Sequence, residues 1–174
     1  MSGTIQLPAL AAALLLVGCG GGYGIQNIDK PAPYEYESWT KPGMTQLDVK
    51  KALLECGKPS PSPNAFIYEK ALGIKDSDGR LNHQFLTDAC MERAGFAIRW
   101  GDTVAKYCSW DRHKHLPACQ LNAAIPDRSV ERRLNSWYCR LKTDREYCRK
   151  HAFTPSACDD PKKDYENPPS VCRP

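Results

Sequence analysis

The clearest periodic segment of the chain predicts a helix over about residues 45–56. An apolar residue recurs there every three or four positions, which places one face of the helix on a core: Val49, Ala52, Leu53 and Cys56. Thr45-Gln46-Leu47-Asp48 resembles a capping box, with Asp in place of Glu. Gly57 favours a C-terminal cap and Pro59 prevents continuation, so the helix is bounded at both ends.

A second amphipathic segment predicts a helix over about residues 79–94. Its apolar stripe consists of Leu81, Phe85, Leu86, Ala89 and Cys90. Gly95 ends this helix, and residues 96–100 indicate a short strand. Cys56 and Cys90 each lie on the apolar face of their own helix, and packing these faces brings the two cysteines within bridging distance. The pattern therefore favours a Cys56–Cys90 disulfide.

Beyond residue 100 the apolar stripes shorten and charged residues and cysteines dominate. A third helix is predicted over about residues 129–141, with a stripe of Val130, Leu134, Trp137 and Leu141. At about 100° per residue, Cys139 lies opposite this stripe, so its disulfide must bring another segment onto that face. The cysteine-rich tail is the candidate, because residues 159–174 are too polar to order themselves and Cys172 would hold them.

Thr143-Asp144-Arg145-Glu146 is a capping box that predicts a short fourth helix, ending near Pro155. These elements define a mainly α fold: a small disulfide-stapled helical domain with at most a short strand pair. Frequent Pro and sparse Ile and Val argue against a large sheet. Residues 39–100 are expected to form a helical hairpin module, and residues 101–174 a basic, cysteine-rich helical module and tail.

The N-terminal apolar run from Leu7 to Val17 carries no charged side chain and is too short to span a bilayer. It ends in Leu16-Val17-Gly18-Cys19, which resembles the lipobox of bacterial lipoproteins. The resemblance implies that residues 1–18 are a signal peptide and that the chain is cut before Cys19. Cys19 then carries lipid on its sulfur and an acyl group on its new amino group.

Residues 19–38 are accordingly expected to be a lipidated flexible tether, since Gly20 to Gly24 is glycine-rich and Pro31-Ala32-Pro33 favours extended backbone. In the lipoprotein sorting rule, Gly at position 20 in place of Asp implies the outer membrane. Met1 to Thr4 has no Lys or Arg. An ordinary secretory signal cut elsewhere, or a cytosolic protein with an apolar start, is therefore the alternative.

Nine cysteines are present, and an even number remains once Cys19 is set aside: Cys56, Cys90, Cys108, Cys119, Cys139, Cys148, Cys158 and Cys172. An even set in an exported chain indicates four disulfides, although spacing does not fix their pairing. Structural zinc is the alternative. No Cys-x-x-Cys occurs, and Cys148 to His151 is a lone Cys-x-x-His.

The net charge of +4 is too small to indicate nucleic acid or anionic lipid as a partner. Residues 126–151 hold eight Lys or Arg and four Asp or Glu, so this segment carries the surplus. It is a candidate surface for an anionic glycan, for lipid headgroups or for an envelope protein. The candidate residues are Arg128, Arg132, Arg133, Arg145 and Arg149. A solvated helix face is the alternative.

Catalytic motifs give little support to an enzyme, because neither Gly-x-Ser-x-Gly, His-Glu-x-x-His nor a phosphate-binding glycine loop occurs. His113 and His115 could ligate a metal from an extended segment, but the neighbouring Arg112 and Lys114 disfavour a cation. Ser109, with Asp111 and His113, lies too close in sequence to form a catalytic triad. We expect no metal, cofactor or small-molecule substrate.

Trp39 to Thr45, followed by a helix and Cys56-Gly57-Lys58-Pro59, is the densest motif of the chain. Its Gly43-Met44-Thr45 start resembles the opening of SmpA/OmlA (BamE-like) outer-membrane lipoproteins, over about 20 of the 174 residues. That resemblance implies a helical hairpin before a small antiparallel sheet, but the downstream cysteines are extra and alternating strands are missing. With Cys90-Met91, the motif also resembles small bacterial lipoproteins of unassigned role.

These observations lead us to expect a non-catalytic envelope lipoprotein, held in the outer membrane by its lipid and facing the periplasm. Its partners are expected to be the membrane, through the anchor, and an envelope protein. The alternative is a binding module whose basic half, residues 101–174, engages a glycan or an envelope protein. An enzyme is the third candidate.

Overall fold

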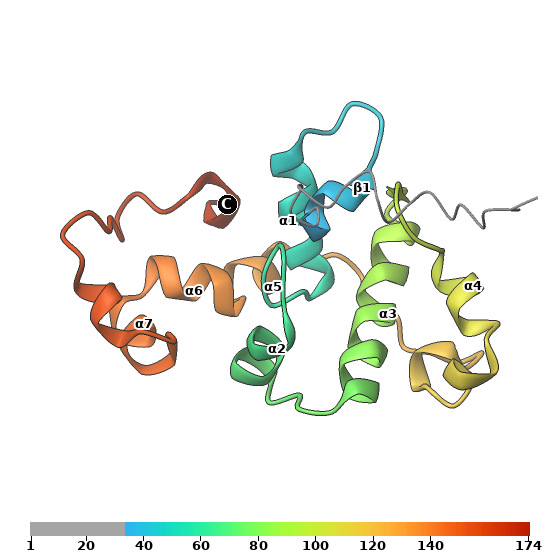
Figure 1. Cartoon of the computed structure of the whole chain (residues 1–174). Helices are drawn as coiled ribbons and strands as arrows, with labels where there is room; N and C mark the ends of the chain where they lie inside the picture. The colour runs from blue at the N-terminus through green and yellow to red at the C-terminus, as the bar shows by residue number, and fades with distance from the viewer. Residues whose placement is uncertain (1–33) are drawn as a thin grey trace, which may run out of the picture. The chain divides into compact units, whose positions relative to one another are not determined.

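Helices α1 (Gln46–Cys56) and α3 (Ser77–Arg93) form the centre of residues 34–174, the part of the chain that the computed structural model describes (Figure 1). Helices make up 55% and strands 3% of these residues, so the predicted mainly α fold is confirmed. The remaining elements, in chain order, are η1 (Glu35–Ser38), β1 (Trp39–Thr40), α2 (Ala65–Leu72), β2 (Ala97–Ile98), α4 (Val104–Cys108), η2 (Asp111–His113), η3 (Pro117–Cys119), α5 (Val130–Leu134), α6 (Trp137–Thr143), α7 (Arg145–His151), η4 (Pro155–Asp159) and η5 (Ser170–Cys172).

Helix α1 begins and ends where its local sequence signals predicted. The Thr45 side chain accepts the backbone N–H of Asp48, and the Asp48 carboxylate accepts the backbone N–H of Thr45 at 2.8 Å. Gly57 takes a φ of 109°, a left-handed conformation that an L side chain would strain. Helix α3 begins slightly earlier than predicted, because the Asp76 side chain caps it through the backbone N–H of Gly79.

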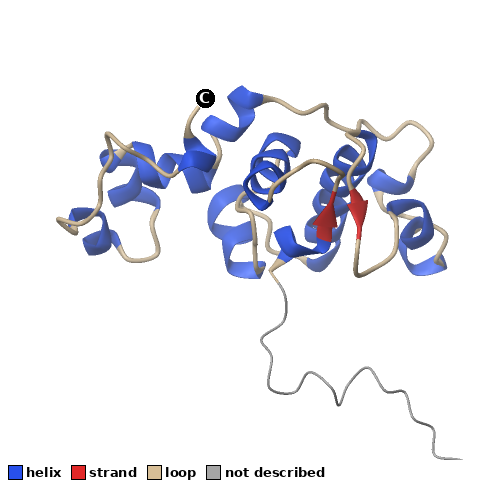
Figure 2. Ribbon diagram, turned by 90° about the horizontal axis from the view of Figure 1, so that it is seen from above, coloured by secondary structure: helices blue, strands red, loops and turns tan. Residues whose placement is uncertain are grey.

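The main core lies between α1, α3 and the two strands. It consists of Trp39, Val49, Ala52, Leu53, Cys56, Cys90, Met91 and Phe96. The strands β1 and β2 pair antiparallel, with Trp39 opposite Ile98, and they are the predicted short strand pair (Figure 2). Trp39 is only 2% exposed, so the chain is already docked there. The last four residues of the expected tether, Glu35–Ser38, instead form the 3-10 helix η1.

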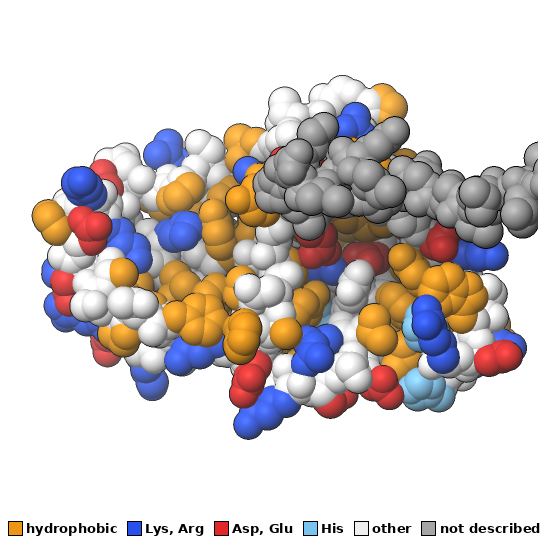
Figure 3. All heavy atoms as spheres, in the orientation of Figure 1, with side chains coloured by type: hydrophobic (Ala, Val, Ile, Leu, Met, Phe, Trp, Pro, Cys, Tyr) orange, Lys and Arg blue, Asp and Glu red, His pale blue; other side chains and the backbone are white. Residues whose placement is uncertain are grey.

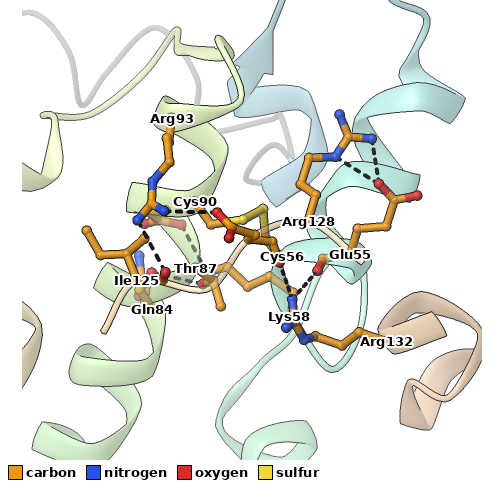
Figure 4. Close-up of a disulfide and its surroundings, with 12 residues drawn as sticks. Glu55, Cys56, Lys58, Gln84, Thr87, Cys90, Arg93, Ile125, Arg128 and Arg132 are labelled. Atoms are coloured by element: carbon orange, nitrogen blue, oxygen red, sulfur yellow. Dashed lines mark hydrogen bonds and ion pairs between the residues drawn. A yellow bond between two sulfur atoms is a disulfide. The ribbon is translucent and has the colours of Figure 1, made fainter. Parts of the chain in front are cut away.

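Four disulfides join the eight cysteines that follow Cys19. They are Cys56–Cys90, Cys108–Cys119, Cys139–Cys172 and Cys148–Cys158. The Cys56–Cys90 bond links the facing sides of α1 and α3, at a Cα–Cα distance of 5.6 Å (Figure 4). The pairing derived from the two apolar stripes is confirmed, and so is a bridge from Cys139 to the tail.

The segment expected as one helix over residues 129–141 is instead two short helices, α5 and α6. The expected helix is interrupted at Ser136, because the Ser136 hydroxyl caps α6 by accepting the backbone N–H of Cys139. The predicted apolar stripe is also wrong at its first position, since Val130 is 49% exposed. Arg133 is buried in its place. The fourth helix, α7, begins one residue later than predicted, with Asp144 as its cap.

Helix α2 was not predicted from the apolar pattern. Only Tyr68 of this helix is buried, and the large apolar side chains of Phe66 and Leu72 are exposed. Its local signals are the Asn64 cap and the terminal Gly73. On the other side of α3, α4 and η3 form a second cluster in which Phe85 packs against Val104 and Leu116 (Figure 1).

Residues on both sides of the expected boundary at residue 100 share one compact unit. Helix α1 packs against α5 and η5, and its Leu54 lies in a cluster with Cys139, Val171 and Cys172. The tail is thus held by apolar packing as well as by its disulfide. Within residues 34–174 the longest apolar stretch in a helix falls short of what a bilayer span requires.

Candidate functional site

The five arginines predicted as a binding surface mostly contact the protein itself. Arg133 is 2% exposed; its Nε donates to Glu55 Oε1 at 3.1 Å, and its Nη1 donates to the carbonyl oxygen of Val171 at 2.7 Å and to that of Arg173. Arg128 donates to the other oxygen of Glu55 through Nε at 2.8 Å (Figure 4). The expectation that Arg133 faces a partner is wrong, because this side chain joins α1 to the tail.

The remaining three arginines are anchored at the surface. Arg132 Nη1 donates to the carbonyl oxygens of Glu55 and Asp127, both at 2.6 Å. Arg145 and Arg149 each reach Asp159 Oδ1 at 2.7 Å. Hydrogen bonds from Arg149 and then Arg145 lower the pKa of the Asp159 carboxyl below its ordinary value. These two arginines therefore hold η4 against α7, beside the Cys148–Cys158 bond.

Lys58, directly after α1, lies in a buried ionic cluster that the sequence did not reveal. Its Nζ is 2.7 Å from Glu35 Oε1 in η1 and 3.2 Å from Asp88 Oδ1 in α3. Burial alone would lower the pKa of Lys58, but the carboxylates of Asp88 and Glu35 more than offset burial and raise it. Burial raises the pKa of Glu35, while Lys58 opposes that shift. The cluster fixes η1 onto the helical core.

A groove of about 540 Å³ lies between the end of α1, α2, α3 and the α5–α6 turn. Its walls are largely apolar, with Leu72, Leu86 and Trp137 among them, and apolar side chains gather over this part of the face in Figure 3. His83 also lines the groove. Burial, and then the charge of Lys58, lowers the pKa of His83 to about 4, so its ring is neutral near pH 7. The groove offers apolar contact area and few charges.

A second hollow, which we call the lysine pocket, lies between the end of α6 and the C-terminal segment. Its volume is about 420 Å³, and it is lined by Lys142, Lys162, Lys163, Asp164, Asn167, Pro168, Pro169, Ser170 and Arg173. Four of these nine residues are cations and one is a carboxylate. No motif in the sequence pointed to this set, because its members come from two segments that a disulfide brings together.

His113 and His115, the two candidate metal ligands, contact different partners. His113 is buried, and its Nδ1 lies 3.0 Å from the carbonyl oxygen of Tyr107. His115 Nε2 lies 2.9 Å from Asp78 Oδ2 at the surface. Ser109 Oγ donates to the carbonyl oxygen of Lys106 at 2.7 Å, so its hydroxyl is engaged locally. Over residues 34–174, no three His, Cys, Asp or Glu side chains converge as metal ligands would.

The described structure defines a small helical domain cross-linked by four disulfides. Comparison of the chain with protein-family models, curated proteins and solved structures found no match. Cys19 and the motif that resembles a lipobox lie outside the described residues, as do the expected signal peptide and most of the expected tether.

Proposed function

We propose that this protein is a non-catalytic lipoprotein of the bacterial envelope. Its lipid-modified Cys19 anchors it in the outer membrane, and its helical domain faces the periplasm in a structural or protein-interaction role. The observation that carries the proposal is the cysteine inventory. All eight cysteines after position 19 are in disulfides, which leaves Cys19, at the end of the lipobox, as the one cysteine free for lipid.

Disulfides support export because they persist in oxidising compartments such as the bacterial periplasm. A lipid at Cys19 fits that compartment, since a Cys-linked diacyl group and an N-acyl group together would anchor the chain almost permanently. Residues 20–34 would then connect the lipid to η1, where Glu35 enters the buried cluster with Lys58. The anchor would thus be attached to a firmly docked point of the domain.

A structural or interaction role is supported by how the charged side chains are used. Glu55, Arg133 and Lys58 are all buried, and each of them joins segments that lie far apart in the chain. Such groups stabilise one arrangement of the backbone. The apolar groove and the exposed face of α7 are candidate surfaces for an envelope partner.

The alternative function is a binding module in the cysteine-rich half, and the lysine pocket is the observation that favours it. A glycan or an envelope protein with negative charge would be its partner. The arginines named from the sequence support this alternative less, because Arg128, Arg145 and Arg149 already have carboxylate partners.

The anchor is tested by metabolic labelling with palmitate. We expect the wild-type chain to incorporate label and to fractionate with outer membranes, and the Cys19→Ala variant to incorporate none. Gly20→Asp is the matched control: it keeps the lipid cysteine and should retain label, but move the protein to the inner membrane. A wild-type chain that never takes up palmitate would overturn the lipoprotein assignment. Crosslinking in intact envelopes then identifies the partner.

A further inference from the structure

We propose that the lysine pocket binds a phosphate group, either as a free phosphate or diphosphate or as the headgroup of an anionic lipid. The pocket is defined by Lys142 on α6, Lys162 and Lys163 after η4, and Arg173 next to the C-terminus. This inference goes beyond the proposed function, because it assigns a ligand to a particular site. Only its lipid form rests on the proposed membrane anchor.

The first argument is the imbalance of charge. Four cations line the pocket with one carboxylate, that of Asp164. That carboxylate is already engaged, because Asp164 Oδ1 accepts the backbone N–H groups of Glu166 and Asn167, both at 3.0 Å. Hydrogen bonds from Asn167 lower the pKa of the Asp164 carboxyl and keep it ionised, so the lining carries four formal positive charges against one negative charge.

The second argument is that these cations lack the carboxylate partners of several other cations in the same half of the protein, although they gather in one hollow. Arg133, Arg145 and Arg149 each have a carboxylate at ion-pair distance. Within residues 34–174, Lys142, Lys162, Lys163 and Arg173 have none.

The cations of the lysine pocket instead contact uncharged groups. Lys142 Nζ lies 4.2 Å from the centroid of the Tyr138 ring, and Lys163 Nζ lies 3.0 Å from Cys148 Sγ. Arg173 Nε donates to the carbonyl oxygen of Pro168 at 2.8 Å. Burial, and then the positive charge of Lys163, lowers the pKa of Lys142. The two ammonium groups are thus close enough to repel each other, and an anion between them would remove that repulsion.

The third argument is that covalent bonds hold the pocket together. Lys142 follows Cys139 by one helical turn, and Arg173 is adjacent to Cys172, so the Cys139–Cys172 bond brings both cations to one hollow. Lys163 contacts Cys148, whose disulfide partner is Cys158 in η4. Two disulfides therefore fix the backbone segments that carry the cations before any ligand arrives. Binding then has to order the side chains but not the backbone.

The lining also selects the class of anion. It contains no aromatic residue and no aliphatic side chain beyond Pro168 and Pro169, so it offers no surface for a nucleobase or an acyl chain. Recognition must come from charge and hydrogen bonds. Lysine binds phosphate as a mobile point charge, and several lysines together favour a multivalent group over a single carboxylate. In a lipid complex the headgroup would enter the pocket while the acyl chains stay in the bilayer.

The test uses the full chain carrying Cys19→Ala, purified with its disulfides intact, so that no lipid competes. Its binding of inorganic pyrophosphate is measured by calorimetry at low salt. The pocket variant adds Lys142→Gln and Lys163→Gln. The matched control adds Lys70→Gln and Lys106→Gln, which remove the same charge from two exposed lysines outside the pocket. Circular dichroism and a free-thiol count check that all variants are folded.

We expect the pocket variant to bind pyrophosphate at least about tenfold more weakly, and the control to bind as before, since charge-assisted hydrogen bonds are strong and local. If the double variant does not fold, Lys162→Gln replaces it as the test, because Lys162 is exposed. We then expect a smaller loss of pyrophosphate affinity. No pyrophosphate binding, or an equal loss in the pocket variant and the control, would overturn the proposal.

Binding to vesicles distinguishes a lipid headgroup from a free phosphate or diphosphate as the ligand. Phosphatidylcholine vesicles with and without phosphatidic acid are sedimented with each protein, and the neutral vesicles report insertion of the apolar N-terminal run. Extra binding to phosphatidic acid that depends on Lys142 and Lys163 assigns the site to a lipid headgroup. Pyrophosphate binding without it assigns the site to a free anion. Neither result depends on acylation of Cys19, so a failure here is distinct from a failure of the palmitate experiment.

Discussion

Replacing Arg133 with Met should destabilise the fold far more than replacing any exposed arginine of the same half. The side chain of Arg133 is 2% exposed and that of its partner Glu55 is 7% exposed. Removing one member of a buried ion pair costs about 3–5 kcal/mol, because the other charge remains in a poorly solvated place. Arg128 still reaches Glu55 from a position that is 38% exposed, so we expect about 3 kcal/mol.

The loss of stability in the Arg133→Met variant would be concentrated at the C-terminal tail. Arg133 Nη1 also holds the carbonyl oxygens of Val171 and Arg173, and these would lose their donor. Val171 packs with Leu54, so the contact between α1 and η5 would loosen. Met keeps most of the volume of the aliphatic part of Arg, which limits any cavity to a minor contribution.

Urea unfolding with intact disulfides measures the difference, provided that the slope with denaturant is unchanged. The matched control is Arg149→Met. Arg149 pairs with Asp159 at the surface, where its side chain is 54% exposed, and exposed pairs contribute about 0–1 kcal/mol. Equal midpoints for the two variants would show that the buried network does not stabilise the tail. In the double variant Glu55→Met/Arg133→Met, the loss should be smaller than the sum of the single losses.

Two further predictions concern the tail and the pH dependence of stability. Replacing both cysteines of the Cys139–Cys172 bond with Ser should cost roughly 4 kcal/mol, against roughly 3 for Cys148–Cys158, because their sequence separations are 33 and 10. Limited proteolysis should then cut the tail in the first variant, and equal protection in both would contradict this reasoning. For His83, the unfolded chain takes up a proton below about pH 6.5, whereas the folded ring resists protonation until about pH 4. Stability should therefore fall across that window by at most about 2 kcal/mol, after allowance for partial exposure, and His83→Gln should lose this component of the pH profile.

Local signals in the sequence determined α1, α3 and the bond between them. The caps at Thr45 and Gly57 satisfy backbone groups that lie only a few residues away. An apolar stripe indicates which side of a helix is buried, whichever element packs against it. Two stripes that each contain a cysteine were enough to pair Cys56 with Cys90. The same angular argument placed Cys139 on the side that faces the tail.

Only the tertiary structure decided which charged side chains are buried and which partners they contact. Arg133 and Glu55 are 78 positions apart, and nothing in the neighbourhood of either residue distinguishes a buried arginine from a solvated one. The arginines named as a binding surface were chosen by local charge density, which does not register distant carboxylates such as Glu55. The lysine pocket has no local sequence signature for a related reason. Its cations come from α6 and from the last residues of the chain, and the Cys139–Cys172 bond and the packing of η5 on α1 bring them to the same place.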